Sequence, residues 1–482
     1  MANVKKSTPG MSKEWPAVGR RQFLGLAGTA GAGLLVLRSG ALGAEAPSNK
    51  LNIAMIGTGG RAGAHFGVAS GENIVALCDV NEQHLEKAAK RCPNAKTYVD
   101  WRKCLDQKDI NAVICSTTDF THAFVANWAL NRDLHVYCEK PLGNSVEEAR
   151  TVRASYLKRK DKVATQCGTQ RHAMDNFNRV AELIRDGAIG ELSQAHAWGN
   201  RQIRRPGYLP AQGEPPKHLH YDLWLGPTPF HPYNPGYFGG CLAWNMYWDF
   251  GSGQIGDMGS HTMDLVWNAI DPVRPTTAQA ESYPAGSAEA GGGGGGRRGE
   301  KGKDAPAKPI PPHPDVTPVE LHSSFDMPAN DWRPAIKVNW WQGGMMPRSP
   351  RGYVDLNKIG HGAMFKGKNG FLICDFNSRI LIPFGDADDM TYYKPRTKET
   401  LQPPVGGFQK QWVDACKDPA KKRTDCDFDY SGTMIETMLL GLVAYRVGKK
   451  ISYDGEKGVV TDNDEANALL KRKYREGWTL NG

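Results

Sequence analysis

The sequence predicts an α/β protein with two domains, the first built on a doubly wound parallel sheet. Three observations lead to this fold class. The chain has 482 residues, which is too long for one ordinary hydrophobic core. Short apolar runs alternate with helix-like segments from residue 51 to about 168. A glycine-rich turn directly follows the first apolar run.

The first strand and its turn predict a dinucleotide site. The apolar run 51–56 leads into GTGGRA (57–62), a G-x-G-x-x-A turn before an expected helix, and a second strand (74–77) leads to Asp79. Glycines let backbone amides approach a pyrophosphate, and an acid at this position takes the ribose hydroxyls. Because Asp79 would repel a 2′-phosphate, NAD is favoured over NADP. The candidate cofactor residues are Gly57, Gly59, Gly60, Arg61 and Asp79.

The alternation of strands and helices continues to the end of the first domain. We expect a helix at 82–91, a strand at 112–115, a helix at 121–131, a strand at 134–137, a helix opened by the capping box of Ser145 and Glu148, and a strand at 162–166. In such sheets ligands bind beyond the carboxyl ends of the strands.

Lys140 follows one of these strand ends and is fixed by the proline after it. Beside a positively charged nicotinamide ring, its pKa should be lowered toward useful acid–base chemistry.

The stretch GSGQIGDMGSHTMD (251–264) places Asp257 and His261 four residues apart, on one face of a helix. Either a metal ion or proton transfer could use such a pair. No third or fourth metal ligand stands at a recognisable spacing, so we expect no metal.

Four stretches together resemble the Gfo/Idh/MocA family of nicotinamide-dependent oxidoreductases: IGTGGRAG (56–63), STTDFTHA (116–123), CEKPLGNS (138–145) and the stretch 251–264. The resemblance covers nearly everything from Leu51 to the last helix. It implies an N-terminal Rossmann domain, a C-terminal α+β domain with a largely antiparallel open sheet, and a homo-oligomer.

The same resemblance implies roles for single residues. Lys140, Asp257 and His261 would meet over the nicotinamide. His261 would take the hydroxyl proton, Lys140 would hydrogen-bond the same oxygen, and Asp257 would orient the histidine or hold a neighbouring hydroxyl. Further cofactor contacts would come from Thr117, His122, Glu139 and Lys140. The chain departs from the family pattern at Thr118 and Phe120, which predicts a slightly altered cofactor floor.

The N-terminal residues 1–46 are predicted to be a twin-arginine signal peptide. Arg20-Arg21 precede a weakly apolar run that ends at Leu37, and an Ala-x-Ala site follows at 44–46. The run is too short for a stable membrane span. A general secretory signal and an uncut anchor are the alternatives. We expect the twin-arginine machinery as a partner and a periplasmic or other extracytoplasmic location.

Charge and cysteines exclude other classes of protein. The formal charge of +9 includes six basic residues against two acids within the first 46, and the rest is scattered. We therefore expect no nucleic-acid partner. The ten cysteines form no CxxC pair or dense disulfide framework, which predicts buried free thiols.

Residues 47–168 form the predicted cofactor domain, and residues 169–482 form the second domain, for substrate and oligomerisation. The second begins with a helix at 176–186, preceded by Arg171, which is either a sugar or carboxylate contact or an exposed arginine. An aromatic-rich region offers Tyr247 and Trp248 as substrate contacts. A flexible Gly/Pro-rich insertion is expected at 284–318, and an amphipathic helix at about 431–447 should pack back on the protein.

These features together predict an exported NAD-dependent enzyme that transfers hydride at a secondary alcohol of a sugar, sugar acid or polyol. Free NAD is scarce outside the cytoplasm, so a tightly held cofactor that is reduced and reoxidised in each cycle is expected. One alternative is redox-neutral glycoside cleavage, with His261 or Tyr247 as the base. Another is a carbohydrate-binding protein with a dead site.

Overall fold

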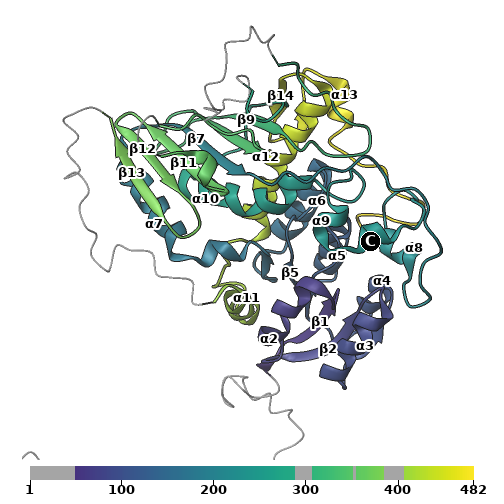
Figure 1. Ribbon diagram of the computed structural model, residues 1–482. Coiled ribbons are helices and arrows are strands. Elements are labelled where there is room, and N and C mark those ends of the chain that lie inside the picture. Colours follow the sequence, from purple (N-terminus) through teal and green to yellow (C-terminus); the bar gives the residue numbers. More distant parts are fainter. Residues whose placement is uncertain (1–48, 288–306, 351–353, 385–406) are drawn as a thin grey trace, which may run out of the picture. The chain divides into compact units, whose positions relative to one another are not determined.

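The computed structural model describes residues 49–287, 307–350, 354–384 and 407–482 (Figure 1). The predicted signal peptide (1–46) and the central part of the predicted insertion (284–318) lie outside the described residues. The described residues have no helix whose length and apolar character would suit a membrane span.

The first sheet has six parallel strands in the order β3-β2-β1-β4-β5-β6, which confirms the predicted doubly wound fold. Its strands are β1 (Asn52–Ile56), β2 (Asn73–Cys78), β3 (Lys96–Tyr98), β4 (Ala112–Cys115), β5 (His135–Cys138) and β6 (Thr165–Cys167). All except the short β3 were expected from the sequence. β3 has one partly exposed and two exposed residues, so it lacks the apolar run that marks a buried strand.

Helices connect these strands: α3 (Glu82–Arg91), α4 (Trp101–Cys104), α5 (Asp119–Asn131) and α6 (Val146–Leu157). Ser145 caps α6 as predicted, because its hydroxyl accepts a hydrogen bond from the Glu148 amide at 3.2 Å. The Glu148 carboxylate, however, accepts from the amide of Asn144 at 2.7 Å instead of completing the box.

The helix expected after the glycine turn is broken. The chain forms a 3₁₀ turn, η3 (Gly60–Ala64), and then the single-turn helix α2 (Phe66–Ala69). Four glycines lie within residues 60–71, and each weakens a helix by about 1 kcal/mol relative to alanine. The sequence therefore places a turn rather than a long helix beside the dinucleotide site.

The second sheet has nine strands in the order β13-β12-β11-β7-β10-β9-β8-β14-β15. It is antiparallel except where β7 and β10 pair in parallel, as the family resemblance implied. The strands are β7 (Leu192–Gly199), β8 (Thr277–Glu281), β9 (Leu321–Met327), β10 (Ile336–Gln342), β11 (His361–Gly367), β12 (Gly370–Cys374), β13 (Arg379–Pro383), β14 (Ile451–Asp454) and β15 (Val459–Val460).

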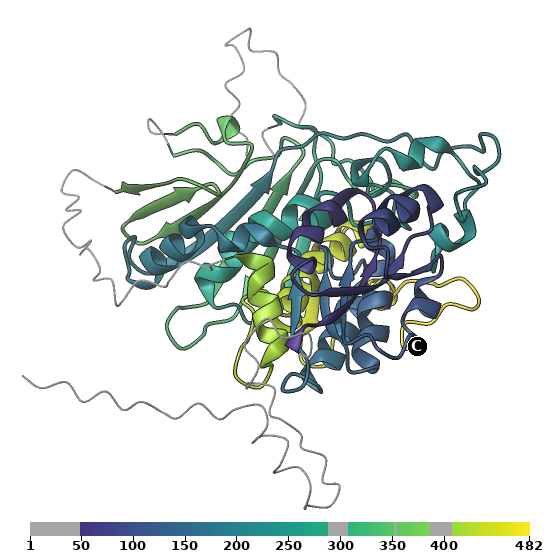
Figure 2. The same ribbon diagram turned by 90° about the horizontal axis from the view of Figure 1, so that it is seen from below.

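Helix α10 (Ser260–Ile270), which carries His261, lies against this second sheet. Helix α7 (Asp175–Arg185) packs against α10, and α10 also contacts β7 and β11 (Figure 2). A π-helical turn, η6 (Ile255–Gly259), leads directly into α10. Asp257 therefore lies in a π turn, a feature that occurs frequently at functional sites.

Helix α12 (Phe428–Val447) joins the two domains. It packs against α6 of the first domain and against β8 and β9 of the second sheet. All residues from 434 to 445 are buried, so the predicted amphipathic face is wrong: the helix is covered on all sides. It is also not the last helix, since α13 (Asp464–Ala468) follows.

Shorter elements complete the described chain. They are η4 (Gln170–Ala173), α8 (Tyr221–Leu225), η5 (Pro235–Phe238), α9 (Cys241–Trp244), η7 (Leu356–Lys358) and α11 (Phe408–Lys417).

Candidate active site

The glycine turn has the shape of a dinucleotide cradle. Gly57 has a φ of +82°, and a Cβ there would lie 2.4 Å from the carbonyl oxygen of Ser116, so only glycine fits. The Asp79 carboxylate accepts hydrogen bonds from the amides of Thr58 at 2.8 Å and Gly59 at 3.2 Å. The turn and the acid therefore lie side by side, as a nucleotide pyrophosphate and ribose require.

Glu139 contacts the glycine turn and stabilises it. It is buried and contacts Arg61 Nε at 3.0 Å and His65 Nε2 at 2.8 Å. Burial opposes its charge, but His65 and Arg61 outweigh that effect and lower the pKa of Glu139. Its predicted role as a direct cofactor contact stays a prediction; its contacts with Arg61 and His65 position the loop that would hold the cofactor.

Lys140 and Asp257 meet as the resemblance implied, although they are 117 residues apart in sequence. Lys140 Nζ lies 2.5 Å from Asp257 Oδ1, and both side chains are largely buried. The other oxygen of Asp257 accepts a hydrogen bond from Arg201, which follows β7 and was not predicted.

The expected direction of the Lys140 pKa is wrong for this structure. Burial lowers the pKa of Lys140, but Asp257 and the buried Asp119 raise it overall. Asp119 itself was not predicted, and burial raises its pKa well above the ordinary value. Lys140 therefore keeps its proton and serves as a hydrogen-bond donor at neutral pH.

His261 is poised to accept a proton. Its ring is buried, and Nδ1 has no hydrogen-bond partner among the described residues. Burial lowers the pKa of His261 well below its ordinary value, and the nearby cations Lys140, Arg171, Arg61 and Arg201 lower it further. The imidazole is neutral at pH 7, which is the form a general base needs. Asp257 is bonded to two cations and does not orient the ring.

Arg171 reaches the same place from the end of β6. It lies in η4, and its guanidinium stacks over the Phe376 ring at 4.0 Å from the centroid. The neighbouring His172 anchors η4, because its Nδ1 lies 2.9 Å from Asp264 on α10. Tyr430 donates a hydrogen bond to the same carboxylate at 2.5 Å. A buried network thus fixes the backbone that presents Arg171.

The two predicted aromatic substrate contacts lie elsewhere. Tyr247 is fully buried and stacks on Tyr208 at 5.2 Å, so it offers no surface to a substrate. Trp248 donates through Nε1 to the carbonyl of His313 at 2.9 Å and lies under Arg446, near the end of α12. Most of the aromatic-rich region is core, because its rings fill the gap between the domains.

Phe120 explains that arrangement. Its ring is fully buried and contacts Trp224 at 5.5 Å, Phe250 at 5.4 Å and Trp244 at 6.0 Å. The predicted alteration of the cofactor floor stays a prediction. The phenyl ring at this position has a structural role. It attaches an aromatic cluster of the second domain to the loop after β4.

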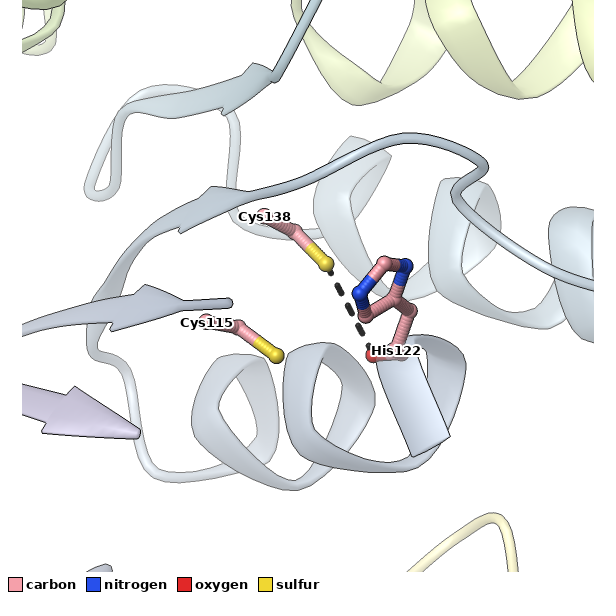
Figure 3. Close-up of side chains that lie close together, drawn as sticks. All are labelled: Cys115, His122 and Cys138. Carbon is pink, nitrogen blue, oxygen red and sulfur yellow. Dashed lines mark hydrogen bonds between the residues drawn. The ribbon is translucent and has the colours of Figure 1, made fainter. Parts of the chain in front are cut away.

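His122 is held by backbone carbonyls, and its predicted contact with the cofactor stays a prediction. It is buried, with Nδ1 at 2.8 Å from the Pro141 carbonyl and Nε2 at 3.3 Å from the Thr117 carbonyl. It converges with Cys115 and Cys138, which gives a group of three potential metal ligands (Figure 3). Both ring nitrogens already face carbonyl oxygens, so this arrangement favours a packed, hydrogen-bonded cluster that holds Lys140's loop. Thr117 remains partly exposed at the end of β4.

The residues that sequence reasoning missed are Arg201, Asp119 and His65. Arg201 lies in an RQIRR segment. The cluster of arginines is visible in the sequence, but no sequence spacing links it to Asp257. Asp119 lies inside one of the motifs, and His65 follows the glycine turn, so only their three-dimensional contacts reveal them.

Comparison with known proteins supports this picture. Residues 51–167 match the family model described as the oxidoreductase family, NAD-binding Rossmann fold, and residues 204–281 match that family's C-terminal alpha/beta domain. The chain thus resembles the Gfo/Idh/MocA oxidoreductase family over these two regions. Its first domain is accordingly an NAD-binding Rossmann domain.

Curated relatives match over part of their length. An inositol 2-dehydrogenase of Arthrobacter sp. (strain FB24) is 30% identical over 162 residues, which is 33% of this chain and 48% of that protein. A glycosyl hydrolase family 109 protein of Solibacter usitatus is 30% identical over 241 residues, which is 43% of this chain and 52% of that protein. The chain thus spans about half the length of these relatives.

Solved structures share the fold of this chain. The WlbA dehydrogenase of Bordetella pertussis, crystallised with NADH and UDP-GlcNAcA, aligns with a TM-score of 0.54 at 14% identity. The alignment covers 84% of this chain and 99% of that one. At this identity the likeness concerns the fold alone.

Proposed function

We propose that the protein is an exported NAD-dependent oxidoreductase that transfers hydride at a secondary alcohol of a sugar, sugar acid or polyol. The observation that carries this proposal is the pairing of a neutral, buried His261 with a protonated Lys140 held by Asp257. The site would then offer a proton acceptor and a hydrogen-bond donor to a hydroxyl group that must lose its proton as hydride leaves the carbon.

The chain's own residues divide this work. The glycine turn and Asp79 would hold NAD, which would supply a hydride acceptor for the alcohol carbon. His261 takes the hydroxyl proton. Lys140 donates a hydrogen bond to the same oxygen and stabilises the charge that develops on it, and Asp257 keeps the ammonium in place. The predicted homo-oligomer belongs to the same proposal.

A strap formed by residues 218–225 supports retention of the cofactor. Its backbone bonds to the turn after β2: the Glu82 amide donates to the His218 carbonyl and the His220 amide donates to the Val80 carbonyl, both at 2.9 Å. The ring of His220 also lies 2.8 Å from the Glu82 carboxylate. This turn directly follows Asp79, where the adenosine ribose is expected.

The other end of the strap is held at the loop after β4. Trp224, within α8, packs on Phe120, and Arg475 from the C-terminal segment donates to the carbonyls of Asp222 at 2.8 Å and Gly226 at 3.1 Å. The strap therefore crosses from the β2 turn to the β4 loop, on either side of the glycine turn of β1. A nucleotide bound there would have to pass the strap to leave.

Retention matters because of the proposed location. An exported enzyme cannot draw on the cytoplasmic pool of NAD, and the twin-arginine route exports proteins already folded around their cofactors. A held cofactor that is reduced by one substrate step and reoxidised by the next would turn over outside the cytoplasm.

The test begins with the protein purified from the exported fraction. After denaturation, the supernatant is assayed for nicotinamide nucleotide; a near-stoichiometric yield of NAD is expected. No nucleotide, together with weak binding of added NAD, would refute the retained cofactor and leave an ordinary dehydrogenase or a binding protein. Recovery of the protein only from the cytoplasm, with residues 1–46 intact, would refute export.

The second candidate function is redox-neutral cleavage of a glycosidic bond on the same site. The similarity to a glycosyl hydrolase family 109 protein favours it. The retained-NAD protein is given glycosides alone, or a sugar with a second sugar as acceptor. Cleavage without an acceptor indicates the glycosidase reaction, and exchange only with an acceptor indicates the oxidoreductase. If Lys140→Ala left either activity unchanged, Lys140 would not take part in the reaction; if the protein bound sugars but catalysed neither reaction, the chain would be a carbohydrate-binding protein with a dead site.

A further inference from the structure

Arg171 is a cation without an acidic partner beside the candidate site. Among the residues that the structure describes, no carboxylate lies within ion-pair distance of its guanidinium. Its guanidinium stacks on the face of the Phe376 ring, 4.0 Å from the centroid. The stacking fixes the plane of the guanidinium and leaves its N–H groups available, which suits bidentate binding of a carboxylate.

Arg201 shares its carboxylate partner, Asp257, with Lys140. Its Nη1 donates to Asp257 Oδ2, while the other oxygen of the same carboxylate is taken by Lys140. About a third of the Arg201 side chain is exposed, so part of its guanidinium can still meet a ligand. One carboxylate therefore serves two cations.

The charges at this place do not balance. Lys140 and Arg201 share one carboxylate, Asp257, and Arg171 has no carboxylate partner among the described residues. Burial raises the pKa of the neighbouring Asp119 well above its ordinary value and so weakens its contribution of negative charge. Burial lowers the pKa of Arg171, and Arg201 lowers it further, so the two guanidinium groups repel each other. Such repulsion favours a bound anion.

The cofactor does not account for this anion site. The pyrophosphate is expected at the glycine turn of β1, where Arg61 stands, and Arg61 is paired with Glu139. Arg171 lies beyond β6 and Arg201 beyond β7, on the side of the second domain. Both influence His261, so an anion between them would belong to the molecule whose hydroxyl His261 deprotonates.

We propose that Arg171 and Arg201 form a carboxylate subsite, so that the substrate is a sugar acid rather than a neutral sugar or polyol. This inference rests on the proposed function, because the subsite is placed relative to the base His261. The carboxylate of the substrate would dock on the two guanidinium groups. The hydroxyl to be oxidised would then lie against His261 and Lys140.

The experiment measures binding and hydride transfer separately on the NAD-loaded full-length protein. Calorimetry compares two matched pairs of probes, D-glucuronate with D-glucose and D-galacturonate with D-galactose. At least one acid should bind tenfold or more tightly than its neutral partner. Arg171→Met and Arg201→Met should each weaken that acid by roughly ten- to a hundredfold, the range for a charged hydrogen-bonded pair, and leave the neutral sugar within about twofold.

Arg132→Met is the matched control. It removes one arginine charge at the end of α5, where Arg132 pairs with Asp106, and should leave the acid preference unchanged. Neutral sugars that bind as tightly as the acids, unchanged acid binding in both site variants, or no binding by any acid would each overturn the subsite. Tight acid binding without reduction of NAD would instead support the subsite and count against the proposed oxidoreductase activity.

Discussion

Phe120 allows the strap and the cofactor to be tested together. The ring lies at the start of α5 and is fully buried under the aromatic rings of the second domain. Phe120→Leu keeps an apolar side chain of similar length but removes the ring that Trp224, Trp244 and Phe250 contact. The strap then loses its anchor at the β4 loop while its bonds to the β2 turn remain.

The magnitude follows from the one ring contact that the strap makes with Phe120, that of Trp224. An aromatic pair contributes about 0.5–1.5 kcal/mol beyond its buried area. At 1.4 kcal/mol per tenfold change, the population with an undocked strap should rise by roughly two- to tenfold. If NAD leaves only when the strap opens, its release should accelerate by a similar factor.

The assay follows release of bound NAD into an excess of a nucleotide scavenger, beside urea unfolding of the same samples. Phe325→Leu is the control, because Phe325 is equally buried but lies in β9 of the second sheet. Both variants should lose stability, and only Phe120→Leu should release NAD faster. Equal release rates in the two variants would show that the strap does not govern retention.

Three further predictions concern titrating groups. Replacing His261 by Ala should lower turnover by about a hundred- to ten-thousandfold without loss of bound NAD, and a smaller drop would assign the base elsewhere. Because the pKa of His261 is lowered, wild-type activity should hold until well below pH 6.5; an acid limb at or above 6.5 would contradict this. Asp257→Asn removes a charge that raises the pKa of Lys140, so the alkaline limb of the pH–rate profile should move to lower pH, and an unmoved limb would exclude Lys140 as the titrating group. Burial lowers the pKa of His135 to about 4, and its Nδ1 accepts a hydrogen bond from the Ala164 amide, so the stabilising effect of the neutral ring is full above pH 6.5 and is lost as the pH falls toward 4. In urea unfolding, His135→Asn should reduce this fall in the free energy of unfolding with decreasing pH. An unchanged pH dependence of the free energy of unfolding would refute the assignment.

Much of the first domain could be predicted because its elements are marked by local patterns. The strand 112–115 and the helix 82–91 have the predicted bounds, since a buried apolar run and a capped helix are both local signals. The same logic failed for the helix after the glycine turn, where helix position was inferred from the motif and the glycines were ignored. The prediction of an amphipathic face on helix α12 failed for the opposite reason. Burial on every side depends on the partners α6, β8 and β9, which no local sequence pattern identifies.

The candidate site could be predicted only in part, and a physical reason separates the residues that were found from those that were missed. Lys140, Asp257 and His261 were found because each lies in a motif. Arg201 was missed because it meets Asp257 across 56 residues, and long-range ion pairs leave no spacing in the sequence. The expected pKa of Lys140 was wrong for the same reason, because the two carboxylates that raise it are distant in sequence.

Asp257 contacts both the proposed catalytic lysine and one arginine of the proposed carboxylate subsite. One oxygen holds Lys140, which the proposed reaction needs as a donor, and the other holds Arg201, which the proposed subsite needs as an anion receptor. A carboxylate substrate would compete with Asp257 for Arg201, and Asp257 would then be freer to serve Lys140 alone. Binding of an acidic sugar and preparation of the catalytic lysine would thus be coupled through one side chain. If so, Arg201→Met should alter the alkaline limb of the pH–rate profile as well as acid binding, whereas Arg171→Met should alter acid binding only.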